Sequence, residues 1–255
     1  MTRAATVHPF VTGDFLAPPD HRLAGQRVLV VAYLIRHPEA LVLLDTGFPW
    51  DDMTTVNDAD VPLPTYPRSV ANALAALGTS LEAVDLVINC HLHIDHAGGN
   101  HRLPPTTPIL VQSVEHADAL AETDPMVRDA LALEALSYRP IDGEHEPLPG
   151  LRIVPSPGHT RGHQSLLVDT EEARVLLAGQ SMPGATDFAH AAYALALSET
   201  KDEPVPPYPD WLPRIMALGP DRAMFAHDLA TWDVRTADAA LPGPPSGSSR
   251  GDRAR

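Results

Sequence analysis

Four side chains that bind metal ions well lie within six consecutive residues of this chain. His91, His93, Asp95 and His96 form the run HLHIDH. Imidazole and carboxylate groups are good ligands for zinc, iron and manganese. In an extended segment His91 and His93 point to one side, and a turn after them would present Asp95 and His96 to a second point nearby. The run therefore predicts a metal centre, since a surface histidine loop or a terminal tag would not follow an apolar strand.

That apolar strand is predicted over residues 84–89, directly before the histidine run. The same order recurs along the chain, with a polar residue following each predicted strand. The strands concerned are 40–44, before Asp45; 151–155, before His159; 174–178, before Gln180; and 222–226, before His227. Candidate ligands are thereby placed along one edge of a sheet assembly, on loops held by a rigid scaffold.

The remaining segments predict interspersed strands and helices, and so an α/β or α+β class. Further strands are expected at 26–36, 109–112 and 165–170, and helices at 68–77, 113–121, 125–137 and 210–218. A Pro-rich loop is expected at 61–67. The Pro- and Ala-rich segment 181–209 is expected to cover part of the site, and residues 241–255 to form a disordered C-terminal tail after one catalytic domain over residues 1–240.

Several motifs together resemble the metallo-β-lactamase superfamily. HLHIDH matches its HxHxDH signature, Pro157–His163 (PGHTRGH) resembles its PGHTxGH motif, and Asp45-Thr46-Gly47 resembles its early DTG turn. His227, after the last predicted strand, resembles its final histidine ligand. The order and spacing hold from about residue 26 to 230. The resemblance implies an α+β fold, an αββα sandwich of two mixed sheets with outer helices, with the metals at one edge.

The resemblance also implies two sets of ligands. The first metal would be held by His91, His93 and His159, and the second by Asp95, His96 and His227. The family usually bridges the two metals with an Asp that follows a Gly, and here that residue is Gln180. A Gln offers one neutral carbonyl oxygen where an Asp offers a charged carboxylate. Two nearby dications repel, so we expect a weaker second site or one in which Gln180 still ligates or hydrogen-bonds a bridging group.

Three further residues near these motifs have candidate roles. Asp45 would orient a ligand imidazole through its free N–H, or cap the following turn. His163 would orient a ligand in the same way, or shape its loop. Cys90 is expected to be a small buried hydrophobe. It is the chain's single cysteine, which excludes an internal disulfide and a thiolate metal cluster.

A metal in such a site makes hydroxide available near neutral pH and polarises a carbonyl oxygen, and Asp95 would orient the water and pass on its proton. This predicts a metal-dependent hydrolase of a lactone or ester, with one or two zinc ions, iron or manganese being possible. The segments 35–38, 43–47 and 158–166 resemble N-acyl-homoserine lactonase-like members of the superfamily. Those lactonases carry a Tyr where this chain has Pro183.

Three alternatives remain open. One is a mononuclear iron sulfur dioxygenase of the same fold, which a single-metal site would suit. Another is a glyoxalase-type thioesterase, which should show basic residues for its thiol substrate. The third is a catalytically degenerate metal-binding protein, for which Gln180 is the only support.

The composition of the chain limits the classes of binding partner that we expect. The net charge is −15, so binding to nucleic acid or an anionic membrane is not expected, and the partner is a small-molecule substrate. No stretch of about 18 apolar residues predicts a membrane span, and residues 1–10 lack the apolar core of a signal peptide. Together with the single cysteine, these features predict a cytoplasmic protein.

Overall fold

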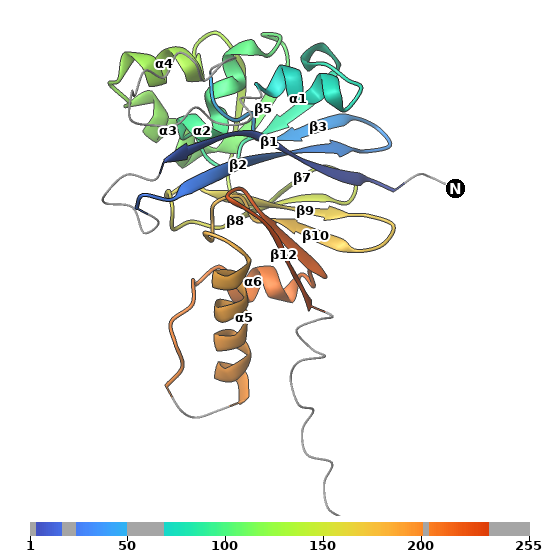
Figure 1. The fold of residues 1–255 in the computed structure, drawn as a ribbon, viewed down its shortest axis with the longest axis vertical. Helices are drawn as coiled ribbons and strands as arrows, with labels where there is room; N and C mark the ends of the chain where they lie inside the picture. Colours follow the sequence, from blue (N-terminus) through green and yellow to red (C-terminus); the bar gives the residue numbers. More distant parts are fainter. Residues whose placement is uncertain (1–3, 17–23, 50–68, 201–203, 235–255) are drawn as a thin grey trace, which may run out of the picture.

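The computed structural model describes residues 4–16, 24–49, 69–200 and 204–234. Two mixed six-stranded sheets pack face to face, with helices on both outer sides (Figure 1). In spatial order, the first sheet holds β1 (Thr6–Leu16), β2 (Arg27–Arg36), β3 (Leu41–Leu44), β4 (Leu86–Ile88), β5 (Pro108–Gln112) and β6 (Ser137–Ile141). The second holds β12 (Asp228–Asp233), β11 (Arg222–Phe225), β10 (Arg174–Leu177), β9 (Gln164–Asp169), β8 (Leu151–Pro155) and β7 (His145–Leu148). The expected αββα sandwich is confirmed.

Side-chain alternation explains why the strands are buried on both faces. In β2, Tyr33 and Ile35 point into the layer between the sheets, while Leu34 points outward to a second apolar layer. In β9, Leu166 points into the layer between the sheets and Leu167 points outward to another apolar layer. Because each sheet is covered on both sides, its central strands are continuous apolar runs, which is what made them recognisable in the sequence.

The helices cover the two outer faces (Figure 1). Over the first sheet lie α1 (Val70–Ala76), α2 (Ile94–Ala97), α3 (Ser113–Leu120) and α4 (Pro125–Leu131), with short 3-10 turns at Leu81–Ala83 and Gly98–Arg102. Under the second lie α5 (Ala185–Thr200) and α6 (Leu212–Ala217). Val70 and Leu74 of α1 pack against β2 and β3, while Phe188 of α5 packs against Phe225 of β11.

One expectation about the helices was wrong. The helix expected over 125–137 ends at Leu131, because Ala132 takes the left-handed conformation with φ 45° and β6 begins at Ser137. Within the segment 181–209, which was expected to cover part of the site, residues Ala185–Thr200 form α5, and its Phe188 and Leu195 pack beneath the second sheet. The loop expected at 61–67 and the tail at 241–255 lie outside the described residues.

Helix α5 begins against a carboxylate from another element. The backbone N–H of Ala185 donates to Oδ2 of Asp228, the first residue of β12, at 3.0 Å. A side chain at Gly184 would collide with that oxygen, since a Cβ there would lie 2.6 Å from it. Asp228 therefore satisfies a free donor at the helix start and adds a favourable charge at the positive end of the helix.

Replacing Asp228 with Ala should lower the free energy of unfolding by about 1 kcal/mol, the usual effect of losing a helix N-terminal cap. For a chain of this size that is a drop of roughly 2–4 °C in melting temperature, measured by differential scanning calorimetry. Asp129→Ala is the matched control, because Asp129 is exposed on α4. Equal melting temperatures for the two variants would contradict the capping role.

Among the described helices, none combines the length and apolar character needed to cross a bilayer.

Candidate metal centre

The candidate ligands meet at one edge of the sandwich, where strands of both sheets end. The first sheet supplies Asp45 after β3, and His91, His93, Asp95 and His96 after β4. The second sheet supplies His159 after β8, His163 before β9, Gln180 after β10 and His227 after β11. Every residue that the sequence analysis placed in the site is therefore found at this edge.

Among the described residues, four groups of three side chains come close enough to share an ion. Two of them include the buried Cys90, and the other two are the sets that the resemblance implied. His91, His93 and His159 form the first, and their ligand atoms lie within 4.8 Å of one another. In it, Nδ1 of His93 is 3.0 Å from Nε2 of His159. His91 is buried at the base, and the other two rings are exposed at the mouth.

Asp95, His96 and His227 form the second group. Nε2 of His96 lies 3.3 Å from Asp95 Oδ2 and 3.3 Å from His227 Nε2. Nε2 of His227 lies 3.6 Å from the same Asp95 oxygen. The side-chain oxygen Oε1 of Gln180 joins this group at 3.1 Å from His96 Nε2.

These separations suit a divalent ion. Two ligand atoms that are each about 2.0–2.1 Å from a tetrahedral zinc lie roughly 3.3 Å apart. Buried polar atoms normally have a partner. Yet Nε2 of His91 is buried and has no hydrogen-bond partner among the described residues. Three acceptor atoms, His227 Nε2, Asp95 Oδ2 and Gln180 Oε1, surround Nε2 of His96, and each could offer a lone pair to a bound cation.

The rings of His96 and His227 each have a protein hydrogen-bond acceptor on the side away from the site, and this acceptor fixes which ring nitrogen faces the site. Oδ2 of Asp45 lies 3.0 Å from Nδ1 of His96, and the carbonyl of Leu29 lies 2.6 Å from Nδ1 of His227. Each ring therefore donates Nδ1–H away from the cluster and turns Nε2 inward. This is the usual arrangement behind a metal-bound imidazole.

The turn formed by Asp45, Thr46 and Gly47 holds His96 from both its ring and its main chain. Asp45 takes the left-handed conformation, φ 64°, which is uncommon for a residue with a side chain. The backbone N–H groups of Thr46 and Gly47 both donate to the carbonyl of His96, at 2.7 and 3.0 Å. Of the two roles expected for Asp45, contact with a ligand imidazole is the one that the geometry has.

In the second group, the charges of His96 and Asp95 shift each other's pKa. Burial alone would lower the pKa of His96, but Asp95, Cys90 and Asp45 raise it well above its ordinary value. Burial alone would raise the pKa of Asp95, but His96 and His227 lower it well below its ordinary value. Asp95 is therefore ionised near neutral pH.

The other histidines are held neutral. Burial, and then the positive charge of His96, lower the pKa of His91. Lost hydration and neighbouring imidazoles lower the pKa of His159 to about 4, and burial and His96 lower that of His227 to about 4. A neutral imidazole is the form that binds metal, so these three rings are ready to do so near pH 7 without losing a proton.

Comparison with known proteins assigns the family. The family description "Metallo-beta-lactamase superfamily" matches residues 25–227. The chain belongs to the metallo-β-lactamase superfamily. Within it, the chain is 35% identical over 156 residues to an N-acyl homoserine lactonase of Bacillus sp, covering 58% of this chain and 61% of that protein. It is 28% identical over 171 residues to N-acyl homoserine lactonase AttM of Rhizobium johnstonii, covering 60% and 65%. The chain thus aligns with about three fifths of the length of these relatives.

A solved member of the superfamily has the same architecture over nearly the whole chain. It is an N-acyl homoserine lactone hydrolase with the product N-hexanoyl-L-homoserine bound at its catalytic metal centre. The TM-score is 0.66 at 26% sequence identity, over 96% of this chain and 99% of that one.

In this metallo-β-lactamase fold, His163 holds a loop rather than a candidate ligand. Its Nε2 accepts the backbone N–H of Gln180 at 3.0 Å. Its Nδ1 lies 2.9 Å from Ser156 Oγ, which lies 2.7 Å from Ser165 Oγ, and that hydroxyl donates to the carbonyl of Ala178. Counting one proton per hydroxyl, the chain runs from His163 Nδ1–H outward, which leaves Nε2 free to accept. His163 therefore fixes the main chain of Gln180.

Sequence reasoning missed Glu115, at the start of α3. Its buried carboxylate accepts the backbone N–H of Leu92 at 2.9 Å, the hydroxyl of Thr160 at 2.6 Å and the backbone N–H of Gly162 at 3.2 Å. The Glu115 carboxylate therefore joins the loop that carries His93 to the loop that carries His159. Gly162 must lack a side chain here, because a Cβ would lie 2.4 Å from that of Glu115. The only signal in the sequence was an acidic residue in a first helical turn, which is common.

Replacing Glu115 with Gln should lower the free energy of unfolding by about 2–3 kcal/mol, since an amide cannot accept all three bonds and a buried donor is left unpaired. Urea denaturation would measure it. Glu134→Gln is the control, because Glu134 is exposed. If Glu115→Gln unfolds at the same urea concentration as that control, Glu115 does not hold the two loops together.

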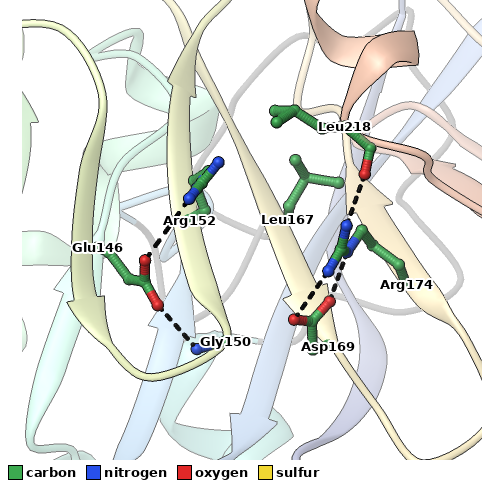
Figure 2. A pocket seen from close by; sticks show the side chains of 7 residues that line it. All are labelled: Glu146, Gly150, Arg152, Leu167, Asp169, Arg174 and Leu218. Carbon is green, nitrogen blue, oxygen red and sulfur yellow. Dashed lines mark hydrogen bonds and ion pairs between the residues drawn. The ribbon is translucent and has the colours of Figure 1, made fainter.

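Two hollows differ in their relation to this centre. One, of ≈ 570 Å³, opens beside His93 and Asp95 and has Leu92, Ile94 and Leu131 in its apolar lining. The other, drawn in Figure 2, lies at the opposite ends of β8, β9 and β10. Its charged side chains are already paired, Arg152 with Glu146 and Arg174 with Asp169. Only the first can serve the metal centre.

Proposed function

We propose that this chain is a metal-dependent hydrolase that opens the lactone ring of an N-acyl homoserine lactone or a close relative. The observation that carries the proposal is the pair of ligand groups at one sheet edge, His91 with His93 and His159, and Asp95 with His96 and His227. The lactonases to which the chain is similar support the substrate class.

The proposed metal is zinc, held in the first position by three neutral imidazoles and in the second by Asp95, His96 and His227. Nitrogen and carboxylate ligands at these separations suit zinc well, and iron or manganese would accept the same set. The ligands of the first position are uncharged, so a dication would keep its full Lewis acidity there. Gln180 would add a neutral oxygen to the second position where an Asp would add a charge, so repulsion between two dications would be offset less and the second ion would bind more weakly than with an Asp.

When bound, the metal would supply a Lewis acid and lower the pKa of water. The chain's own contribution is Asp95. Its ionised carboxylate can accept the proton of the attacking water and return it to the ring oxygen as the acyl C–O bond breaks. The products are then a hydroxyl group and a carboxylate, with one net proton released to solution. Glu115 and Asp45 would hold the surrounding loops and rings still while this occurs.

The cavity beside His93 offers space for the substrate. Its volume of ≈ 570 Å³ is within the range that small-molecule ligands occupy. Its apolar side chains, among them Ile94, Val127 and Leu131, can contact an acyl chain, while the ester end reaches Asp95. The cavity lining has more carboxylates than cations, because Arg161 is paired with Asp118 while Asp95, Glu115 and Glu122 also line it, and this favours a neutral substrate over an anion.

The test is proton release from N-hexanoyl homoserine lactone, followed with a pH indicator at weak buffering. Protein stripped by a chelator should be inactive, and adding zinc should restore activity. An oxygen electrode with a persulfide substrate runs alongside. Zinc-dependent acid release without oxygen uptake supports the proposal. Oxygen uptake with bound iron would instead establish a sulfur dioxygenase, a candidate that the neutral Gln180 favours because it weakens the second position. Neither signal, with metal bound, would mean a degenerate metal-binding protein.

A further inference from the structure

Cys90 lies between the two ligand groups and contacts both. It is buried, directly before His91. Its sulfur is 2.8 Å from Oδ2 of Asp45, 3.2 Å from Nδ1 of His91 and 3.4 Å from Nδ1 of His96. Cys90 is buried in the apolar core, as expected from the sequence, and its sulfur in addition has these three polar neighbours.

The protons around the sulfur can be assigned from geometry. A carboxylate only accepts hydrogen bonds, so the 2.8 Å contact requires the S–H of Cys90 to point at Asp45. The backbone N–H of Cys90 donates to the other oxygen of Asp45, at 2.8 Å. With its one proton used, the sulfur offers His91 only lone pairs. His91 must therefore donate Nδ1–H to the sulfur.

That assignment explains the free nitrogen of His91. With Nδ1 protonated in a neutral ring, Nε2 carries a lone pair, and this is the buried atom that has no partner among the described residues. Asp45 fixes the ring of His96 through the same oxygen that receives the thiol proton. One buried pair, Asp45 with Cys90, thus orients an imidazole in each ligand group.

The main chain at Gly179 passes close to the side chain of Cys90. Gly179, whose φ is +57°, passes so close that a Cβ there would lie 2.7 Å from Cβ of Cys90 and 3.0 Å from its sulfur. The next residue is Gln180. A side chain at residue 179 would therefore collide with Cys90, so the turn that carries Gln180 passes close to the thiol.

We propose that Cys90 is a positioning residue that couples the two metal positions, by donating its thiol proton to Asp45 and accepting Nδ1–H from His91. The inference rests on the proposed metal site but not on the reaction or substrate. Loss of the thiol would leave the ring of His91 free to adopt the other tautomer and would remove one of the donors that hold Asp45 against His96. Outer partners of this kind affect metal affinity by about 10–100-fold.

The test measures zinc affinity by competition with a chelating dye, for the wild type, Cys90→Ala and Cys90→Ser. We expect Ala to weaken zinc binding at both positions by about 10–100-fold. Ser should restore much of it, since a hydroxyl can also donate to Asp45 and accept from His91. Val87→Ala is the control, because Val87 is buried in β4 on the face away from the site. It should lower the melting temperature without weakening zinc binding.

Ring protonation is measured separately, by nitrogen-15 NMR of the histidines in the metal-free wild type, and so does not depend on whether a variant folds. We expect His91 to carry its proton on Nδ1. A proton on Nε2, zinc affinity unchanged in Cys90→Ala, or Ser no better than Ala would each overturn the role of Cys90. A wild type that takes up no zinc would contradict the proposed function, while the NMR result would still decide the proton arrangement.

Discussion

Replacing His93 with Ala should reduce zinc-dependent lactone hydrolysis by more than about 100-fold, because losing even an outer partner of a ligand costs about 10–100-fold. The ring of His93 faces His159 at 3.0 Å and is half of the exposed mouth of the first ligand group. Its removal leaves two imidazoles, which are too few to hold an ion against water. The measurements are initial rates with saturating zinc and metal content by mass spectrometry.

His145→Ala is the matched control for this variant. His145 is an exposed histidine on β7, at the far edge of the second sheet, so its loss removes an imidazole without touching the centre. It should keep the metal content and rate of the wild type. Lactone hydrolysis that persists in a folded His93→Ala protein would show that the reaction takes place elsewhere.

Replacing Gln180 with Asp should tighten the second metal position. The substitution puts a negative charge where a neutral amide oxygen now lies 3.1 Å from His96 Nε2. Two dications in adjacent positions repel, and an added carboxylate offsets part of that repulsion. We expect the dissociation constant of the more weakly bound ion to fall by roughly tenfold or more, equivalent to about 1.4 kcal/mol. Isothermal titration with zinc, after chelation, would resolve the two steps.

Gln180→Asn separates charge from length. Asn has the shorter side chain of Asp but keeps the neutral amide, so it should bind the second ion no better than the wild type. If Gln180→Asn and Gln180→Asp lower the dissociation constant of the second ion equally, the length of the Gln180 side chain limits binding in the wild type, and its lack of charge does not. If neither does, the position already has what it needs from Asp95, His96 and His227.

The sequence predicted which side chains meet at the sheet edge better than it predicted the groups that orient them. The histidines between residues 91 and 96 are close in the chain, so their spacing alone carries the information. The partners that orient them are distant and carry no local pattern. Glu115 is an ordinary acidic residue on a helix, and the acceptor behind His227 is the main-chain carbonyl of Leu29, which any residue would provide.

The strands that escaped prediction are those at or near sheet edges. β1 includes Pro9, Gly13 and Asp14, residues that favour turns, and it pairs with β2 through a register shift between Val11 and Gly13. β7 and β12 are the outermost strands of the second sheet and are largely polar. Without burial on both faces, such strands lack the apolar runs that identified β2, β4 and β9.

The division of the ligands between the sheets has a consequence for how the protein could be taken apart. His93 reaches the centre from the first half of the chain and His159 from the second, and in the other group Asp95 and His227 are divided in the same way. The crossing from one half to the other is the short turn between β6 and β7. Neither fragment of a chain cut at that turn would contain all three members of either candidate ligand group. The first fragment keeps His91, His93, Asp95 and His96, so only zinc uptake beyond what this fragment binds alone would report reassembly of the two fragments.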